Sequence, residues 1–377
     1  MSSSAASTPD TLVTALDARL TDRVTGIARE ELAARAEELG PIAPEAVGLV
    51  EDLQGYLAGG KLLRPRFCFW GGVAALGREP TEAELEALAR HGAAIELVQA
   101  AALLHDDVID HSPMRRGRPA MHVQWALRHR AWELFGDAEE FGVAIAIVLG
   151  DLALSWAEQV AAAVDGEPAA VRRARAEFDA LRTEVMSGQF LDILHQAGGY
   201  HSTPDAEAAA LSVIRWKTVP YTVLRPVRTG AALAGADDAA LTALSDWAVE
   251  VGTAFQLRDD LLSVVGEQSA TGKPIGGDIL EGKRTVLLAR AEAAADAQGR
   301  ELLGRVVGDA DASAEEIAEV HQLMIDTGAV ASVAEEVRHR AARGRELLGA
   351  ATSFGALGRE GLDALAALAT DVDSLPA

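Results

Sequence analysis

Apolar residues recur every three or four positions along almost the whole chain of 377 residues, which is the spacing of amphipathic helices. A first predicted helix ends at Gly40-Pro41 and carries its apolar side chains on one stripe: Leu12, Leu16, Leu20, Val24 and Ile27. No segment shows the alternation that is typical of a half-buried strand. The pattern therefore predicts an all-α fold.

Capping residues and glycines indicate the helix boundaries. Thr81 and Glu84 form a predicted capping box for a long helix that carries Asp106, and Gly77 is the expected cap of the preceding helix. Other helices are predicted at about 44–57, 65–77, 120–134, 138–164, 168–197, 205–234, 238–265, 283–297, 314–327, 329–349 and 359–371. Because the connections are short and show no flexible linker, we expect residues 11–377 to form one large single-domain helical bundle with a central cavity, after a disordered stretch at 1–10.

Composition narrows the class of protein. Hydrophobic residues make up 49% and aromatic residues 5%, which predicts a globular protein with an aliphatic core. A net charge of -23 argues against nucleic acids and anionic membranes as partners. The single cysteine, Cys68, excludes an internal disulfide and has the aromatic neighbours of a core thiol. Without a signal peptide, and with every apolar stretch interrupted by charges or Gly-Asp breaks, the expected location is cytoplasmic, with no stable membrane insertion.

A cluster of acids ends the long helix. Asp106 and Asp110 are four positions apart, so they share a helix face and repel each other unless a cation lies between them. Oxygen-only ligands favour a hard ion such as magnesium. The basic residues that follow, Arg115, Arg116 and Arg118, indicate an anion near that ion. The alternative is an ordinary solvated helix end.

A second helix end repeats this arrangement. Asp259-Asp260 is followed by a loop that contains Lys273, Asp278 and Lys283. Two such helix ends, facing each other across a bundle, could clamp one diphosphate through bridging magnesium ions. Two polar insertions lie between them, at 188–192 and 215–218, and either one alone would be an ordinary surface feature.

Together these blocks resemble a trans-isoprenyl diphosphate synthase of the polyprenyl synthetase family, most like a bacterial geranylgeranyl diphosphate synthase. The resemblance covers Gly59 to Arg290 and has the family's blocks in order. They are Gly59–Pro65, the acids at Asp106–Asp110, Arg115–Gly117, Gly188–Asp192, Lys217-Thr218, the acids from Asp259, and Lys273 with the loop Asp278–Lys283.

The resemblance implies a role for each matching residue. Magnesium ions, three per active site, would be held by Asp106, Asp110 and Asp259, with Asp107 and Asp260 as indirect or water-mediated partners. The allylic diphosphate would contact Arg115, Lys217 and Lys273, and its reacting end would lie against Thr218 and Gln256. The isopentenyl diphosphate pocket would be formed by Lys61, Arg64, Gln99 and Arg116. Lys283 would add positive charge at the mouth.

The implied reaction is head-to-tail (1′–4) condensation of isopentenyl diphosphate with an allylic diphosphate. Magnesium and basic side chains stabilise the charge that develops on the diphosphate leaving group, and apolar walls exclude water from the carbocation. No serine or cysteine nucleophile is required. The resemblance also implies a homodimer.

The second acidic block departs from the family pattern, because Ser263 stands where a third acid is usual. Asp259, Ser263 and Glu267 then resemble the magnesium triad of class I terpene cyclases, which is an alternative reading. Against it, cyclases lack the isopentenyl diphosphate pocket. A further alternative is a non-catalytic partner subunit, although such subunits usually lose acids that are intact here.

Residues just before the first acids are expected to set product length. In the family, Ala101 and Ala102 would form the floor of the tail pocket, where two small side chains leave it open towards Val98. Each helical turn opened would admit about one more isoprene unit, ~5 Å long. Geranylgeranyl diphosphate is the predicted product, and a longer polyprenyl diphosphate is the alternative.

Overall fold

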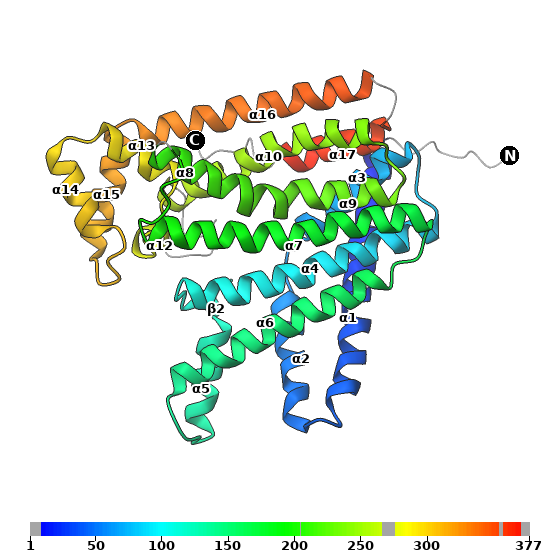
Figure 1. Ribbon diagram of the computed structural model, residues 1–377, viewed down its shortest axis with the longest axis horizontal. Coiled ribbons are helices and arrows are strands. Elements are labelled where there is room, and N and C mark those ends of the chain that lie inside the picture. The colour runs from blue at the N-terminus through cyan, green and yellow to red at the C-terminus, as the bar shows by residue number, and fades with distance from the viewer. Residues whose placement is uncertain (1–8, 204, 266–275, 354–356, 371–377) are drawn as a thin grey trace.

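Long helices run side by side along the molecule in the computed structural model, which describes residues 9–203, 205–265, 276–353 and 357–370 (Figure 1). The first half contains α1 (Pro9–Leu39), α2 (Pro44–Leu57), α3 (Leu63–Leu76), α4 (Glu82–Ile109), the short strands β1 (Met114–Arg115) and β2 (Arg118–Pro119), α5 (Met121–Ala131), α6 (Ala138–Ala162) and α7 (Pro168–Gln196). The second half contains α8 (Ala206–Val213), the π-helical turns η1 (Ile214–Thr218) and η2 (Pro220–Leu224), α9 (Arg225–Leu233), α10 (Asp238–Val265), α12 (Gly277–Leu280), α13 (Val286–Ala294), α14 (Ala297–Val306), α15 (Ala314–Asp326), α16 (Ala329–Ser353) and α17 (Arg359–Thr370).

The all-α prediction is confirmed, and most predicted helices lie where the pattern placed them. Thr81 and Glu84 form both hydrogen bonds of the capping box of α4, and Gly77 ends α3 with a left-handed φ of 65°. The sequence pattern missed α12, α14 and the β1–β2 hairpin. The stretch at 1–10 falls mostly outside the described residues, since α1 already begins at Pro9.

The core is centred on α3, whose aromatic side chains are almost fully buried. Phe67 packs edge-on against Trp247 of α10, with ring centroids 6.0 Å apart. Gly230 of α9 lets the two helices touch, because a Cβ there would lie 1.7 Å from the carbonyl oxygen of Cys68. Cys68 is the expected core thiol: it is fully buried, and burial raises its pKa to about 12.

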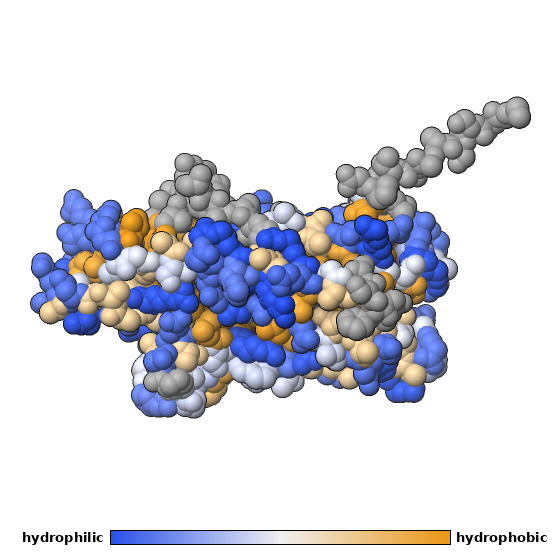
Figure 2. All heavy atoms as spheres, turned by 90° about the horizontal axis from the view of Figure 1, so that it is seen from above, coloured by the Kyte–Doolittle hydropathy of each residue, from blue (hydrophilic) through white to orange (hydrophobic). Residues whose placement is uncertain are grey.

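Helix α6 differs from the sequence expectation. By length and composition this helix could cross a bilayer, and 39% of its most apolar window is buried inside the protein. A helix that packs against α4 and α5 within a bundle passes the same test, because its apolar face serves the core. On the face seen in Figure 2, hydrophilic side chains predominate and hydrophobic ones form small separate patches.

Candidate active site

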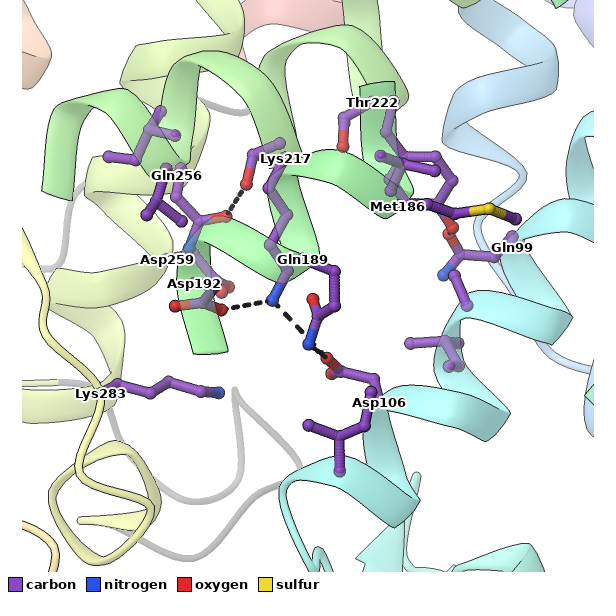
Figure 3. Close-up of a pocket in the computed structure, with 18 of the residues that line it drawn as sticks. Gln99, Asp106, Met186, Gln189, Asp192, Lys217, Thr222, Gln256, Asp259 and Lys283 are labelled. Atoms are coloured by element: carbon purple, nitrogen blue, oxygen red, sulfur yellow. Dashed lines mark hydrogen bonds and ion pairs between the residues drawn. The ribbon is translucent and has the colours of Figure 1, made fainter. Parts of the chain in front are cut away.

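A cavity of about 510 Å³ lies between α4, α7, the π-helical turns and α10. One end is lined by charged side chains: Asp106, Arg115, Asp192, Lys217, Asp259, Asp260 and Lys283. The other end is lined mainly by apolar side chains: Val98, Ala102, Leu154, Val185 and Met186. Figure 3 shows the acids of α4 and α10 on opposite sides of this space, with Lys217 between them.

Lys217 lies at the centre of the charged end. Its Nζ is 2.6 Å from Oδ2 of Asp192 and 3.6 Å from Oδ1 of Asp106, which also accepts a hydrogen bond of 3.2 Å from Gln189 (Figure 3). Burial opposes the charge, but Asp106 and Asp192 raise the pKa of Lys217 above its usual value. Gly188 makes this approach possible, because a Cβ there would lie 2.4 Å from the backbone nitrogen of Lys217.

Asp110 does not line the cavity itself, but it lies close to the charged lining residues Asp106 and Lys283. Burial, and then the negative charge of Asp106, raise the pKa of Asp110 to about 6. Lys283 provides partial compensation, with its Nζ 3.6 Å from Asp110 and 2.8 Å from Glu281. A carboxyl group in this environment favours a nearby cation, so the donor set suits a hard metal ion.

Asp107 is fully buried and does not line the cavity. It accepts hydrogen bonds from Nε of Arg115 at 2.8 Å and from the hydroxyl of Tyr56 at 2.9 Å. Tyr56 was not identified from the sequence, because nothing in its local pattern distinguishes it from a core aromatic residue. The Arg115 guanidinium also lies 4.0 Å from Asp106.

The β1–β2 hairpin explains the Arg-Arg-Gly block. Arg115 pairs with Arg118, and the two turn residues both have left-handed φ values, 51° at Arg116 and 73° at Gly117. This is the type I′ geometry, for which glycine at the second position is favoured. The turn presents Arg115 to the cavity, whereas Arg116 and Arg118 do not line it.

The second acidic block forms a hydrogen-bonded chain across helices. Thr218 donates to Gln256 at 2.8 Å, and Gln256 donates to Asp260 at 2.8 Å. Burial, and then the charge of Asp278, raise the pKa of Asp260 to about 8. Ser263 donates to the backbone oxygen of Asp260 at 2.7 Å and does not line the cavity. Lys273 and Glu267 lie outside the described residues.

Only part of the expected isopentenyl diphosphate pocket borders the cavity. The Arg64 guanidinium stacks over the Tyr221 ring, with its Cζ 4.1 Å from the ring centroid, and donates a hydrogen bond of 3.0 Å to the hydroxyl of Thr222. The hydroxyl of Tyr221 donates to the side-chain oxygen of Gln99. Tyr221 and Thr222 were not identified from the sequence. Lys61 and Arg116 do not line the cavity: Lys61 is exposed, and Arg116 donates to the backbone oxygens of Tyr56 and Ala58 at the end of α2.

Only some of the residues expected to form the floor of the tail pocket line the cavity. Val98 and Ala102 line the apolar end, but Ala101 is fully buried and does not. Leu154 of α6 and Met186 of α7 complete this wall and were not foreseen.

The acidic side chains near the cavity do not by themselves form a complete metal site. Among the described residues, no group of three or more His, Cys, Asp or Glu side chains is arranged to hold a metal. Magnesium commonly takes one or two carboxylates and completes its shell with waters and substrate phosphate oxygens. The separated carboxylates of Asp106, Asp110 and Asp259 fit that mode of binding.

The chain resembles known proteins in both sequence and fold. The polyprenyl synthetase family matches residues 48–324. The crystal structure of geranylgeranyl pyrophosphate synthase from Corynebacterium glutamicum, complexed with isoprenyl diphosphate and magnesium, is 35% identical with a TM-score of 0.87, over 96% of this chain and 99% of that chain.

Two further relatives differ in the products for which they are named. The short chain isoprenyl diphosphate synthase of Methanothermobacter thermautotrophicus is 31% identical over 275 residues, 73% of this chain and 76% of that protein. The nonaprenyl diphosphate synthase of Mycobacterium tuberculosis is 32% identical over 308 residues, 80% of this chain and 82% of that protein. Because the family match and these relatives extend over most of the chain, the protein belongs to the polyprenyl synthetase family.

Proposed function

We propose that this protein is a magnesium-dependent trans-prenyltransferase that condenses isopentenyl diphosphate head-to-tail with an allylic diphosphate and releases geranylgeranyl diphosphate. The observation that carries this proposal is the cavity, which places two acidic helix ends and Lys217 at one end and an apolar tail pocket at the other. Membership of the polyprenyl synthetase family supports the same reaction.

The charged end suits departure of the diphosphate. The allylic C1–O bond breaks, and the diphosphate takes the electron pair. Arg115 and Lys217 donate hydrogen bonds to its oxygens, where they stabilise charge that is larger in the transition state than in the substrate. Magnesium ions held by Asp106, Asp110 and Asp259 would neutralise further charge on the same group.

The other lining residues suit the carbon–carbon step. Arg64 and Gln99 would orient isopentenyl diphosphate so that its terminal double bond forms the new bond to C1 of the cation. Thr218 and Gln256 are hydrogen-bonded to each other, so their polar atoms are held near the reacting carbons. A proton then passes from the new unit to the released diphosphate. Apolar walls keep water away from the cation.

The wall of the tail pocket supports a product of intermediate length, with a longer polyprenyl diphosphate as the second candidate. The lining of this pocket combines small side chains, Val98 and Ala102, with the larger side chains of Leu154 and Met186. The second candidate is favoured by Ala102, because this small side chain on α4 leaves space for the growing chain at that turn of the helix.

We infer a homodimer from the outer side chains of α6 and α7, which are neighbours through ion pairs of Glu158 with Arg175 and Arg182. These helices expose large hydrophobic side chains that do not line the cavity: Ile147, Val148, Phe190 and Ile193. For a chain with a net charge of -23, an apolar face is where a second copy meets least repulsion. A soluble homodimer in the cytoplasm fits this surface.

Product analysis tests the proposal. The protein is incubated with isopentenyl diphosphate, magnesium and each allylic primer in turn, and the products are identified by mass spectrometry. Geranylgeranyl diphosphate is expected, and EDTA should abolish turnover, because the acids then hold no ion to neutralise the leaving group. Turnover that persists in EDTA, or the absence of condensation with every primer, would contradict the proposal.

A further inference from the structure

Asp107 is held on both sides by groups from different parts of the chain. Its Oδ2 accepts the hydroxyl of Tyr56 at 2.9 Å, and its Oδ1 accepts Nε and Nη2 of Arg115, with Nε at 2.8 Å. The Asp107 side chain is 1% exposed. Tyr56 comes from the end of α2 and Arg115 from β1, so this carboxylate joins two segments that are far apart in sequence.

The side chains of Tyr56, Asp107 and Arg115 form a spatial chain that leads from the interior to the cavity wall. Arg115 lines the cavity, whereas Asp107 and Tyr56 lie behind it and do not. The Arg115 guanidinium carries the positive charge that a diphosphate bound beside Asp106 would meet. The Arg115 guanidinium is held in place by its hydrogen bonds to the Asp107 carboxylate, and that carboxylate is itself held by a hydrogen bond from the hydroxyl of Tyr56.

The end of α2 fixes the same hairpin a second time. Arg116, the next residue after Arg115, donates to the backbone oxygens of Tyr56 and Ala58 at 3.1 and 3.3 Å. A cation at a helix C-terminus is stabilised by the unpaired carbonyls there. These hydrogen bonds fix the hairpin backbone against the end of α2. The Tyr56 hydroxyl, acting through Asp107, additionally orients the Arg115 side chain on that hairpin.

We propose that Tyr56 is a positioning residue, whose hydroxyl acts through Asp107 to hold the Arg115 guanidinium at the cavity wall and so sets the affinity for the allylic diphosphate. This inference rests on the proposed function. Removing the hydroxyl leaves one oxygen of a buried carboxylate without its donor. The carboxylate can then turn, and Arg115 turns with it. Nothing in this contact touches Arg64 or Gln99, so isopentenyl diphosphate should bind normally.

The first test is Tyr56→Phe, which removes one oxygen and keeps the ring. We expect KM for the allylic diphosphate to rise about 5- to 10-fold, with KM for isopentenyl diphosphate nearly unchanged and Tm lowered by only a few degrees, as loss of one donor to a buried carboxylate requires. Tyr200→Phe is the matched control, because its hydroxyl is 2.6 Å from Ser212, away from the cavity, and its loss should change neither KM. If Tyr56→Phe instead raises both KM values by similar factors, or lowers Tm without changing either KM, Tyr56 only anchors α2 and the proposal is wrong.

A double-mutant cycle tests whether the effect passes through Arg115. Calorimetry with magnesium and a non-ionising thio-analogue of geranyl diphosphate measures allylic binding without turnover. Tyr56→Phe should weaken binding about 5- to 10-fold in the wild-type background but less than about 2-fold when added to Arg115→Lys. Equal effects in both backgrounds would overturn the proposal. A wild-type protein that neither binds the analogue nor forms product would contradict the proposed function, whereas normal wild-type behaviour with an unaffected Tyr56→Phe would contradict this inference alone.

Discussion

Asp259 and Ser263 lie one helical turn apart on α10, yet Asp259 lines the cavity and Ser263 does not. We expect Asp259→Ala to lower kcat/KM by at least about a hundredfold, because it removes charge that is needed in the transition state. Ser263→Asp and Ser263→Ala should each change it only a few-fold. Steady-state kinetics with both diphosphates measure these effects. A Ser263→Ala variant as impaired as Asp259→Ala would instead indicate a metal triad of the cyclase type.

Ala101 and Ala102 provide a matched pair for the tail pocket. Ala102→Phe should shorten the product towards farnesyl diphosphate while condensation continues, because the ring fills space along the cavity wall. Ala101→Phe, at a fully buried position away from the cavity, should instead destabilise the fold by about 1–3 kcal/mol. Mass spectrometry of the products and thermal unfolding distinguish the two. A stable Ala101→Phe protein that makes a shorter product would reverse this assignment.

The segment from Asp205 to Ala234 shows how an interrupted helix builds the site. The apolar period predicts one continuous helix, but the structure contains two π-helical turns around Pro220. Proline lacks the N–H of a regular helix, and π-helical turns often occur at functional sites. Here they carry Lys217, Thr218, Tyr221 and Thr222, which all line the cavity.

Helices α4 and α7 meet at a buried histidine that should make stability depend on pH. His91 is 1% exposed, lies 6.2 Å from Phe178 between ring centroids, and has no hydrogen-bond partner on either ring nitrogen among the described residues. Burial, and then the charge of Arg175, lower the pKa of His91 from 6.5 to about 4. The unfolded chain therefore binds the proton more readily, so stability falls as pH drops from about 6.5 to 4, by up to about 3 kcal/mol.

His91→Leu should remove this part of the acid sensitivity, which urea unfolding at pH 7 and pH 4.5 would measure. The exposed His339 on α16 offers a matched control, since His339→Leu should leave the difference between the two pH values unchanged. Equal acid sensitivity in the wild type and His91→Leu would show that this histidine does not control the transition.

The outer surface of α6 and α7 gives a prediction about assembly. Ile147→Glu should convert the expected homodimer to monomer, because it places a charge in the proposed apolar interface. Ile325→Glu is the control, since Ile325 is 48% exposed on α15, which is outside the proposed interface on α6 and α7. Sedimentation velocity measures the outcome. A wild-type monomer, or equal dissociation by both substitutions, would contradict the proposed interface.

Much of the fold and of the charged end of the site could be predicted from the chain. A period of three to four residues describes helices because burial acts on one face of each of them. Asp106, Asp259 and Lys217 stood out because charge within an apolar helix is costly unless a ligand or partner compensates it. The short elements α12 and α14 were missed, since so few residues carry too little periodicity.

The chain alone determined the helical architecture, the acidic helix ends and the family blocks, since each depends on neighbours within a few turns. The roles of Tyr56, Tyr221, Leu154 and Met186 were decided only in three dimensions. Their side chains resemble ordinary core residues until distant helices bring them to Asp107 or to the cavity wall. The same holds for Ala101 and Ala102: they are identical in type and adjacent in sequence, and helix rotation alone turns one into the core and the other towards the cavity.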